Sequence, residues 1–194
     1  MLEYSLPKII EIGGAPFAIT NQGDYRMVLD CFSALNDEEL SENEKIIASL
    51  IIFYEDINDI EDLDKIDAQE AIEKMFKFFN CNQDNVGRKM NHRLIDWEKD
   101  ANIICASVNR VAQTEIRSLP YLHWFTFMGY YMEIGECTLS TIVSIRNKIA
   151  NNKKLEKYER DFKAENPEYF NFDFRSTIQK QDDSLIMNLW NGGE

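Results

Sequence analysis

The sequence predicts a mainly α-helical domain with a small β-hairpin near its N-terminus. Apolar residues recur at spacings of three and four in several segments, and most of these segments follow a helix-capping residue. Alternation around a Gly-Gly pair marks one short segment near the start. Because 44% of the 194 residues are hydrophobic, the chain can form a core. We expect one domain over residues 1–166, followed by a C-terminal tail over residues 167–194.

The predicted hairpin covers about residues 8–20, with the sequence KIIEIGGAPFAIT. Its turn falls at Gly13-Gly14, which separates two short apolar runs. We expect Ile10 and Ile12 to share one face, and Phe17 and Ile19 to share another.

Three capping signals predict helices in the first half of the chain. Asp24 precedes an apolar pattern of helical spacing. Ser41 and Glu44 form a capping-box pattern ahead of a second such segment, and Asp67 and Glu70 repeat this pattern ahead of a third.

The second half is more strongly patterned. Asp96 is expected to cap a helix that runs from residue 97 to about residue 111. Pro120 suits the first turn of the next helix, and Gly135 suits its C-terminal end. Thr138 is expected to cap another helix, and a Lys-rich helix is expected over about 153–165.

Charge is distributed unevenly along the chain, whose formal net charge is −13. Residues 37–73 hold fourteen acidic and two basic side chains, whereas residues 142–163 hold seven basic and three acidic ones. The overall sign disfavours binding to nucleic acid or to an anionic membrane. The uneven distribution either steers a partner or a second copy of the chain, or simply keeps a solvated surface soluble.

No motif predicts a catalytic, cofactor or metal site. The four cysteines are far apart, which disfavours structural zinc and disulfides and fits a reducing compartment. Read as a calcium loop from Asp56, the acidic run has Glu61 where an EF-hand needs glycine. No apolar stretch is long enough to span a bilayer, and the first residues do not form a signal peptide.

The segment 120–134, PYLHWFTFMGYYMEI, is predicted to be one helix that is apolar nearly all the way round. Such a helix is either buried centrally or placed in an interface. Both interpretations stay open at this point. In the second, aromatic side chains bind another protein, and the expected anchors are Tyr121, Trp124, Phe125 and Tyr131.

A thin polar stripe on this helix needs partners if it is buried. It comprises His123, Thr126, Tyr130 and Glu133. We expect Arg117 and Arg146 to be these partners, and Asp96 to be a further structural anchor. A catalytic pair of His123 and Glu133 is disfavoured, because ten helical residues separate them by about 15 Å.

Three runs of the sequence carry a resemblance to a known family. They are LIDWEKDANII (94–104), EIRSLPYLHWFTFMGYYMEIGE (115–136) and STIVSIRNKIANNKKLEKYER (140–160). In the order and spacing of their aromatic and charged residues, these runs resemble a family of small tail-module proteins from tailed bacteriophages that infect Gram-positive bacteria. The resemblance is best over about 94–166.

This resemblance implies a non-enzymatic tail assembly chaperone. Such a protein binds the tape measure protein, keeps it soluble and helps to recruit tail-tube subunits. It acts in the cytoplasm of the host bacterium and leaves before the virion is finished. A long helical partner with repeated apolar faces calls for an apolar surface on its carrier.

Two other functions are weighed against the chaperone. The acidic run 37–73 is typical of a DNA-mimic decoy for a host nucleic-acid-binding protein, although the basic stretch 142–163 disfavours this function. A small enzyme that uses Asp96, His123 or Glu133 lacks support from residue spacing.

The C-terminal tail contains a possible short docking helix. Asp182 and Asp183 precede an apolar run that ends with Trp190. This segment either docks onto another subunit, with Trp190 as its anchor, or folds back onto its own domain.

Overall fold

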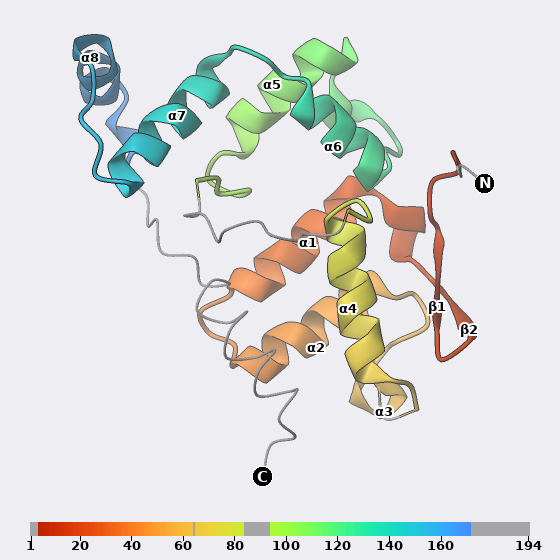
Figure 1. Ribbon diagram of the computed structural model, residues 1–194. Helices are drawn as coiled ribbons and strands as arrows, with labels where there is room; N and C mark the ends of the chain where they lie inside the picture. Colours follow the sequence, from red (N-terminus) through yellow and green to blue (C-terminus); the bar gives the residue numbers. More distant parts are fainter. Residues whose placement is uncertain (1–3, 64, 84–93, 172–194) are drawn as a thin grey trace. The chain divides into compact units, whose positions relative to one another are not determined.

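The computed structural model describes residues 4–63, 65–83 and 94–171, and these residues form two compact units (Figure 1). Unit 1 holds the described residues before 84 together with Pro120–Met128, and unit 2 holds residues 94–119 and 129–171. The mainly helical fold with an N-terminal hairpin is confirmed. The single domain over 1–166 stays a prediction, and the tail with Trp190 lies outside the described residues.

The hairpin consists of strands β1 (Ile9–Ile12) and β2 (Ala15–Ala18), paired antiparallel. Gly13 and Gly14 have φ values of +58° and +82°, which a two-residue hairpin turn requires and glycine adopts without strain. The expectation of two separate apolar faces was wrong. Ile10 lies directly opposite Phe17, and directly opposed residues of an antiparallel pair share one face.

The outer edge of β2 is closed by the segment that follows the second helix. The Ala18 N–H donates to Asp56 Oδ2 at 2.8 Å, and the Ala18 carbonyl accepts the Glu55 N–H at 3.0 Å. Pro16 has no N–H to offer on the same edge.

The outer edge of β1 is bound by a helix of the same unit. Glu70 accepts the Gly13 N–H at 2.7 Å, and Lys74 donates to the Glu11 carbonyl. A 2.7 Å ion pair joins Glu70 to Lys74 within that helix. Side chains of this helix therefore bind the backbone of the hairpin. They also cover part of a strand edge that could otherwise pair with another chain.

Four α-helices complete the larger part of unit 1, and three of them begin at the predicted capping residues. Asp24 accepts the Arg26 N–H, Ser41 and Glu44 form the reciprocal capping box, and Asp67 accepts the Glu70 N–H. The helices are α1 (Tyr25–Asn36), α2 (Glu42–Phe53), α3 (Ile60–Leu63) and α4 (Ala68–Phe79), with a 3-10 turn η1 (Thr20–Gly23) before α1.

Gly23 in η1 is a position that no other residue fills without strain. Its φ is +80°, and a Cβ placed there would lie 2.9 Å from His123 Nε2 and 2.9 Å from the ring of Phe78. The turn before α1 therefore packs directly against α4 and against the segment that contains His123.

Unit 2 contains α5 (Ala101–Ala112), η2 (Ile116–Ser118), α7 (Thr138–Ala150), α8 (Lys157–Glu165) and η3 (Pro167–Tyr169). Helix α6 (Trp124–Met132) begins in unit 1 and ends in unit 2. Among the described residues, none of the helices is long and apolar enough to span a membrane.

Three predicted starts in unit 2 are corrected by one to four residues. Asp96 caps a turn and not the helix, because it accepts the N–H groups of Glu98 and Lys99 while α5 begins at Ala101. The N-cap of α7 is Cys137, whose Sγ accepts the Ser140 N–H at 3.4 Å, so Thr138 is its first helical residue. Helix α8 begins at Lys157 after Glu156.

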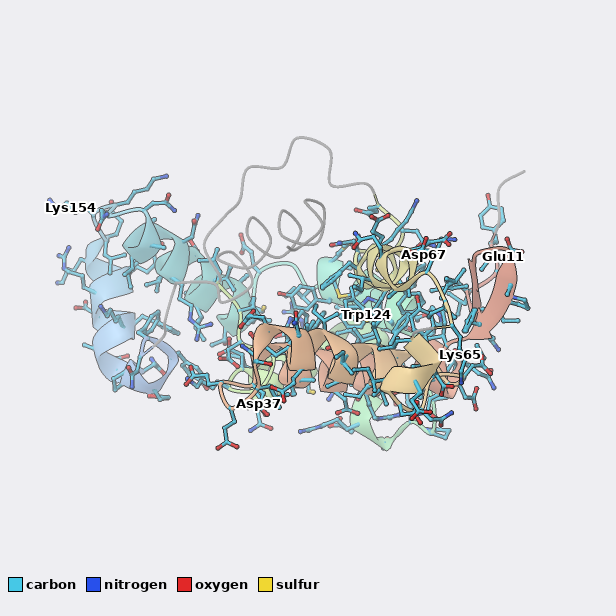
Figure 2. All side chains as sticks on the ribbon, turned by 90° about the horizontal axis from the view of Figure 1, so that it is seen from below. Glu11, Asp37, Lys65, Asp67, Trp124 and Lys154 are labelled. Carbon is cyan, nitrogen blue, oxygen red and sulfur yellow. The ribbon has the colours of Figure 1, made fainter. Side chains whose placement is uncertain are left out.

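Trp124 lies in the core of unit 1, with 1% of its surface exposed (Figure 2). We expect Trp124→Ala to lower the free energy of unfolding by about 3–5 kcal/mol, because it removes a large buried ring and leaves a cavity. Urea unfolding followed by far-UV circular dichroism measures this change. Tyr4→Ala is the matched control, because Tyr4 is 89% exposed, and its effect should stay within about 0.5 kcal/mol. Equal effects of the two variants would contradict the placement of Trp124.

Candidate interaction surface

The segment before α6 is extended and is bound to the start of α1. The Leu122 N–H donates to Asp24 Oδ2 at 2.9 Å, and the Leu122 carbonyl accepts the Tyr25 N–H at 2.9 Å. The prediction that Pro120 opens the helix was therefore wrong. Backbone groups used in this bridge cannot enter a helical hydrogen-bond ladder, so α6 begins at Trp124.

Trp124 projects from the first turn of α6 into the core of unit 1. Its ring packs edge-on against Phe32 at 5.8 Å and stacks with Phe127 at 5.5 Å. Its indole N–H donates to the Phe79 carbonyl at 2.9 Å, which satisfies its polar group in the core. In the folded chain Trp124 is thus a core residue, as in the interpretation of this helix as centrally buried, and not an exposed binding anchor.

His123 is buried beside Trp124 and connects three segments of unit 1. Its Nδ1 accepts the Phe125 N–H at 3.0 Å, as the side chain of an N-cap residue does. Because Nδ1 is an acceptor, Nε2 carries the ring hydrogen and donates to the Pro7 carbonyl at 3.0 Å. The imidazole therefore fixes both the start of α6 and the segment before β1.

Burial lowers the pKa of His123 below its usual value. The hydrogen bond to Pro7 and the charge of Asp24 raise this pKa, and the charge of Lys8 lowers it, but burial is the largest cause. The neutral ring is also the form that both hydrogen bonds require, since protonated Nδ1 cannot accept from Phe125.

The expected arginine partners of the polar stripe bind elsewhere. Arg117 is exposed and forms an ion pair with Glu115 at 2.8 Å, and this pair lowers the pKa of Glu115 to about 2. Arg146 binds Asp100. Glu133 is exposed just after α6, so its charge needs no buried partner.

A buried ion pair organises unit 2. Arg146 on α7 donates to both carboxylate oxygens of Asp100, at 2.6 and 3.0 Å, and the two side chains are 2% and 1% exposed. The same guanidinium donates to the Leu94 and Tyr169 carbonyls. Asp100 also accepts the Asp96 N–H at 2.9 Å. One guanidinium thus joins the start of α5, the middle of α7 and the end of η3.

The outward face of α6 is apolar and partly exposed. Met132 is 59% exposed, and Phe125 and Met128 are half-buried. These residues are spaced three and four apart and share one face of the helix. Tyr121 lies four residues before Phe125 in the extended segment, is 38% exposed and donates its hydroxyl to the Gln22 carbonyl at 3.0 Å. We call Tyr121, Phe125, Met128 and Met132 the α6 face.

Two of the four predicted anchors, Tyr121 and Phe125, belong to the α6 face, whereas Trp124 is in the core. Tyr131 is half-buried and lies 5.4 Å from Trp97, between ring centroids. The sequence interpretation missed Met128 and Met132, although their spacing from Phe125 was a readable signal. Within the described residues, the structure shows no group of three side chains that could hold a metal ion.

The described chain is therefore a helical protein with an apolar helix face and an acidic first unit. A family model described as Bacteriophage Gp15 protein matches residues 2–170. The chain belongs to this family of bacteriophage proteins. Neither a curated protein nor a solved structure matches it.

The stability of the protein is expected to fall as the pH is lowered through about 6.5, the usual pKa of histidine. The pKa of His123 is lowered in the folded chain, so the unfolded chain binds more protons in this range and acid favours unfolding. Urea unfolding between about pH 7.5 and pH 5.5 measures the slope of the free energy of unfolding against pH. His123→Gln should flatten it. An unchanged slope in His123→Gln would overturn the assignment.

Arg146→Met is expected to lower the free energy of unfolding by about 3–5 kcal/mol, because it leaves Asp100 charged, buried and without its partner. Arg117→Met is the matched control, since an exposed ion pair contributes about 0–1 kcal/mol. Chemical denaturation of both variants measures the difference. Similar losses in the two would show that the buried pair does not hold unit 2 together.

Proposed function

We propose that the protein is a phage tail assembly chaperone that binds the tape measure protein through the α6 face. It keeps this partner soluble while tail-tube subunits are recruited. It works in the cytoplasm of the host bacterium, without a catalytic step, cofactor or metal, and leaves before the virion is complete. Membership of a bacteriophage family and the resemblance of residues 94–166 to tail-module proteins support this proposal.

The observation that carries the proposal is the exposure of apolar side chains on α6 and in the segment just before it. Met132 exposes 59% of its surface, and Tyr121 exposes 38%. Methionine side chains are flexible and polarizable, so they adapt to partner surfaces of varied shape. A tape measure protein presents many similar helical faces in succession, and a chaperone for it needs an adaptable surface more than one specific pocket.

The acidic character of unit 1 fits a carrier that must stay in solution. Among the described residues of unit 1, sixteen acidic side chains stand against six basic ones. A strong net charge opposes aggregation of a protein that exposes apolar surface. Many weak contacts along a long partner also permit release, because each contact can be lost separately.

The alternative function, an acidic decoy that mimics DNA, is less well supported by the local contacts. Asp37, Asp59 and Asp67 each accept backbone N–H groups at a turn or a helix start. Part of the acidic run is therefore accounted for by capping, which satisfies N–H groups that helix starts leave unpaired.

Co-expression with the tape measure protein of the same phage tests the proposal. We expect the protein to raise the soluble fraction of the tape measure protein and to co-purify with it at low salt. The double variant Tyr121→Ser/Met132→Ser should lose at least half of this effect, because it removes the two most exposed members of the α6 face. Densitometry of soluble and insoluble fractions gives the measurement.

Ile9→Ser is the matched control, because Ile9 is a large apolar residue with 60% exposure on the hairpin. It should retain the full effect. The proposal fails if neither the tape measure protein nor the tail-tube protein co-purifies. Salt-sensitive binding of a host nuclease or polymerase in their place would instead favour the decoy.

A further inference from the structure

Two short helices each present one large exposed hydrophobic residue among exposed side chains that are mostly of one charge sign. On α3 of unit 1, Ile60 is 58% exposed, and exposed Glu55, Asp59 and Glu61 surround it in sequence. We call these four residues the acidic face. Neither Ile60 nor its acidic neighbours belong to the α6 face.

The second such surface is on unit 2, at α8 and the turn before it. Tyr158 is 64% exposed, and its basic neighbours are the exposed residues Lys153, Lys154, Lys157 and Arg160. These five residues form the cationic face, and Figure 2 labels Lys154 within it. Arg160 donates to the Leu155 carbonyl at 2.6 Å, which holds the turn against the helix.

Acidic side chains near Tyr158 offset only part of this positive charge, since two of them, Glu156 and Asp161, are exposed beside four exposed basic residues. Glu159 is 1% exposed and already forms an ion pair with Lys148 at 2.6 Å. That contact lowers the pKa of Glu159, so its carboxylate stays ionised and paired with Lys148. The exposed charge around Tyr158 is therefore positive on balance.

We infer that the cationic face of one copy of this chain binds the acidic face of a second copy. The two faces are complementary in charge, and each combines one exposed apolar side chain with exposed charged neighbours in sequence, a combination typical of small protein interfaces. Because the two faces differ, each pair leaves one face of each kind free. The association is therefore heterologous and can continue from copy to copy.

This inference goes beyond the proposed function, and its test uses the purified chain alone. Sedimentation velocity at about 25 mM and about 500 mM salt, over a range of protein concentrations, measures self-association. At low salt we expect the average mass to rise above 22.7 kDa with concentration. At high salt the association constant should fall at least about tenfold, because salt screens exposed charges.

Charge reversal identifies the faces. Glu55→Lys/Glu61→Lys and Lys154→Glu/Lys157→Glu should each abolish self-association, and an equimolar mixture of the two variants should associate again through the reversed pair. The side chains changed are exposed, so circular dichroism should show intact helices. Glu38→Lys/Glu39→Lys makes the same charge change at an exposed site outside both faces and should leave association unchanged.

A monomer at every concentration in low salt would overturn the inference. So would association that survives both reversals, or reversed variants that fold but do not associate when mixed. Salt-dependent compaction at constant mass would mean that the two faces bind within one chain, which also contradicts the inference.

Discussion

The binding of the Leu122 backbone to the Asp24 carboxylate and the Tyr25 N–H is the constraint on which unit 1 depends. This binding brings a segment nearly one hundred residues distant in sequence against the start of α1, and it sets where α6 begins. Asp24 thereby serves two segments, since it also accepts the Arg26 N–H as the N-cap of α1. Once α6 begins at Trp124, the periodicity of the helix determines which rings enter the core.

The same constraint explains how a helix that is apolar nearly all the way round can contribute both to the core of unit 1 and to an exposed surface. Trp124 and Phe127 are buried, whereas Met132 is exposed and Phe125 is half-exposed. A start one residue earlier would rotate this pattern by about 100°, because each helical residue turns by that angle. His123 reinforces the register, since its ring accepts the Phe125 N–H at the first turn. We propose that the face left outside is where the partner binds.

Local signals in the sequence predicted local structure well. Gly13-Gly14 determines the hairpin turn, and Ser41 with Glu44 determines the start of α2, because each signal acts within four residues. The helix does not begin at Pro120, because the carboxylate of Asp24, which is distant in sequence, accepts the Leu122 N–H. The fold class could be predicted because hydrophobic periodicity indicates helices. The details of the fold could not, because periodicity does not indicate which segments pack together.

The candidate site was only partly predictable. The sequence indicated the aromatic segment and named Tyr121 and Phe125, but it could not distinguish them from Trp124, because apolar residues cover nearly every face of that helix. The sequence also could not predict the ion-pair partner of Arg146. Asp100 lies 46 residues away, and nothing local distinguishes it from the acidic side chains nearer in sequence.

The central claim, that the outward face of α6 holds the tape measure protein, is tested most directly by photocrosslinking. A photoreactive phenylalanine analogue is placed at position 132 or, as a control, at position 9; Met132 and Ile9 are 59% and 60% exposed. During co-expression with the tape measure protein, we expect crosslinks from position 132 and few from position 9. Crosslinks from position 9 alone, or none from position 132 while the complex still forms, would contradict it.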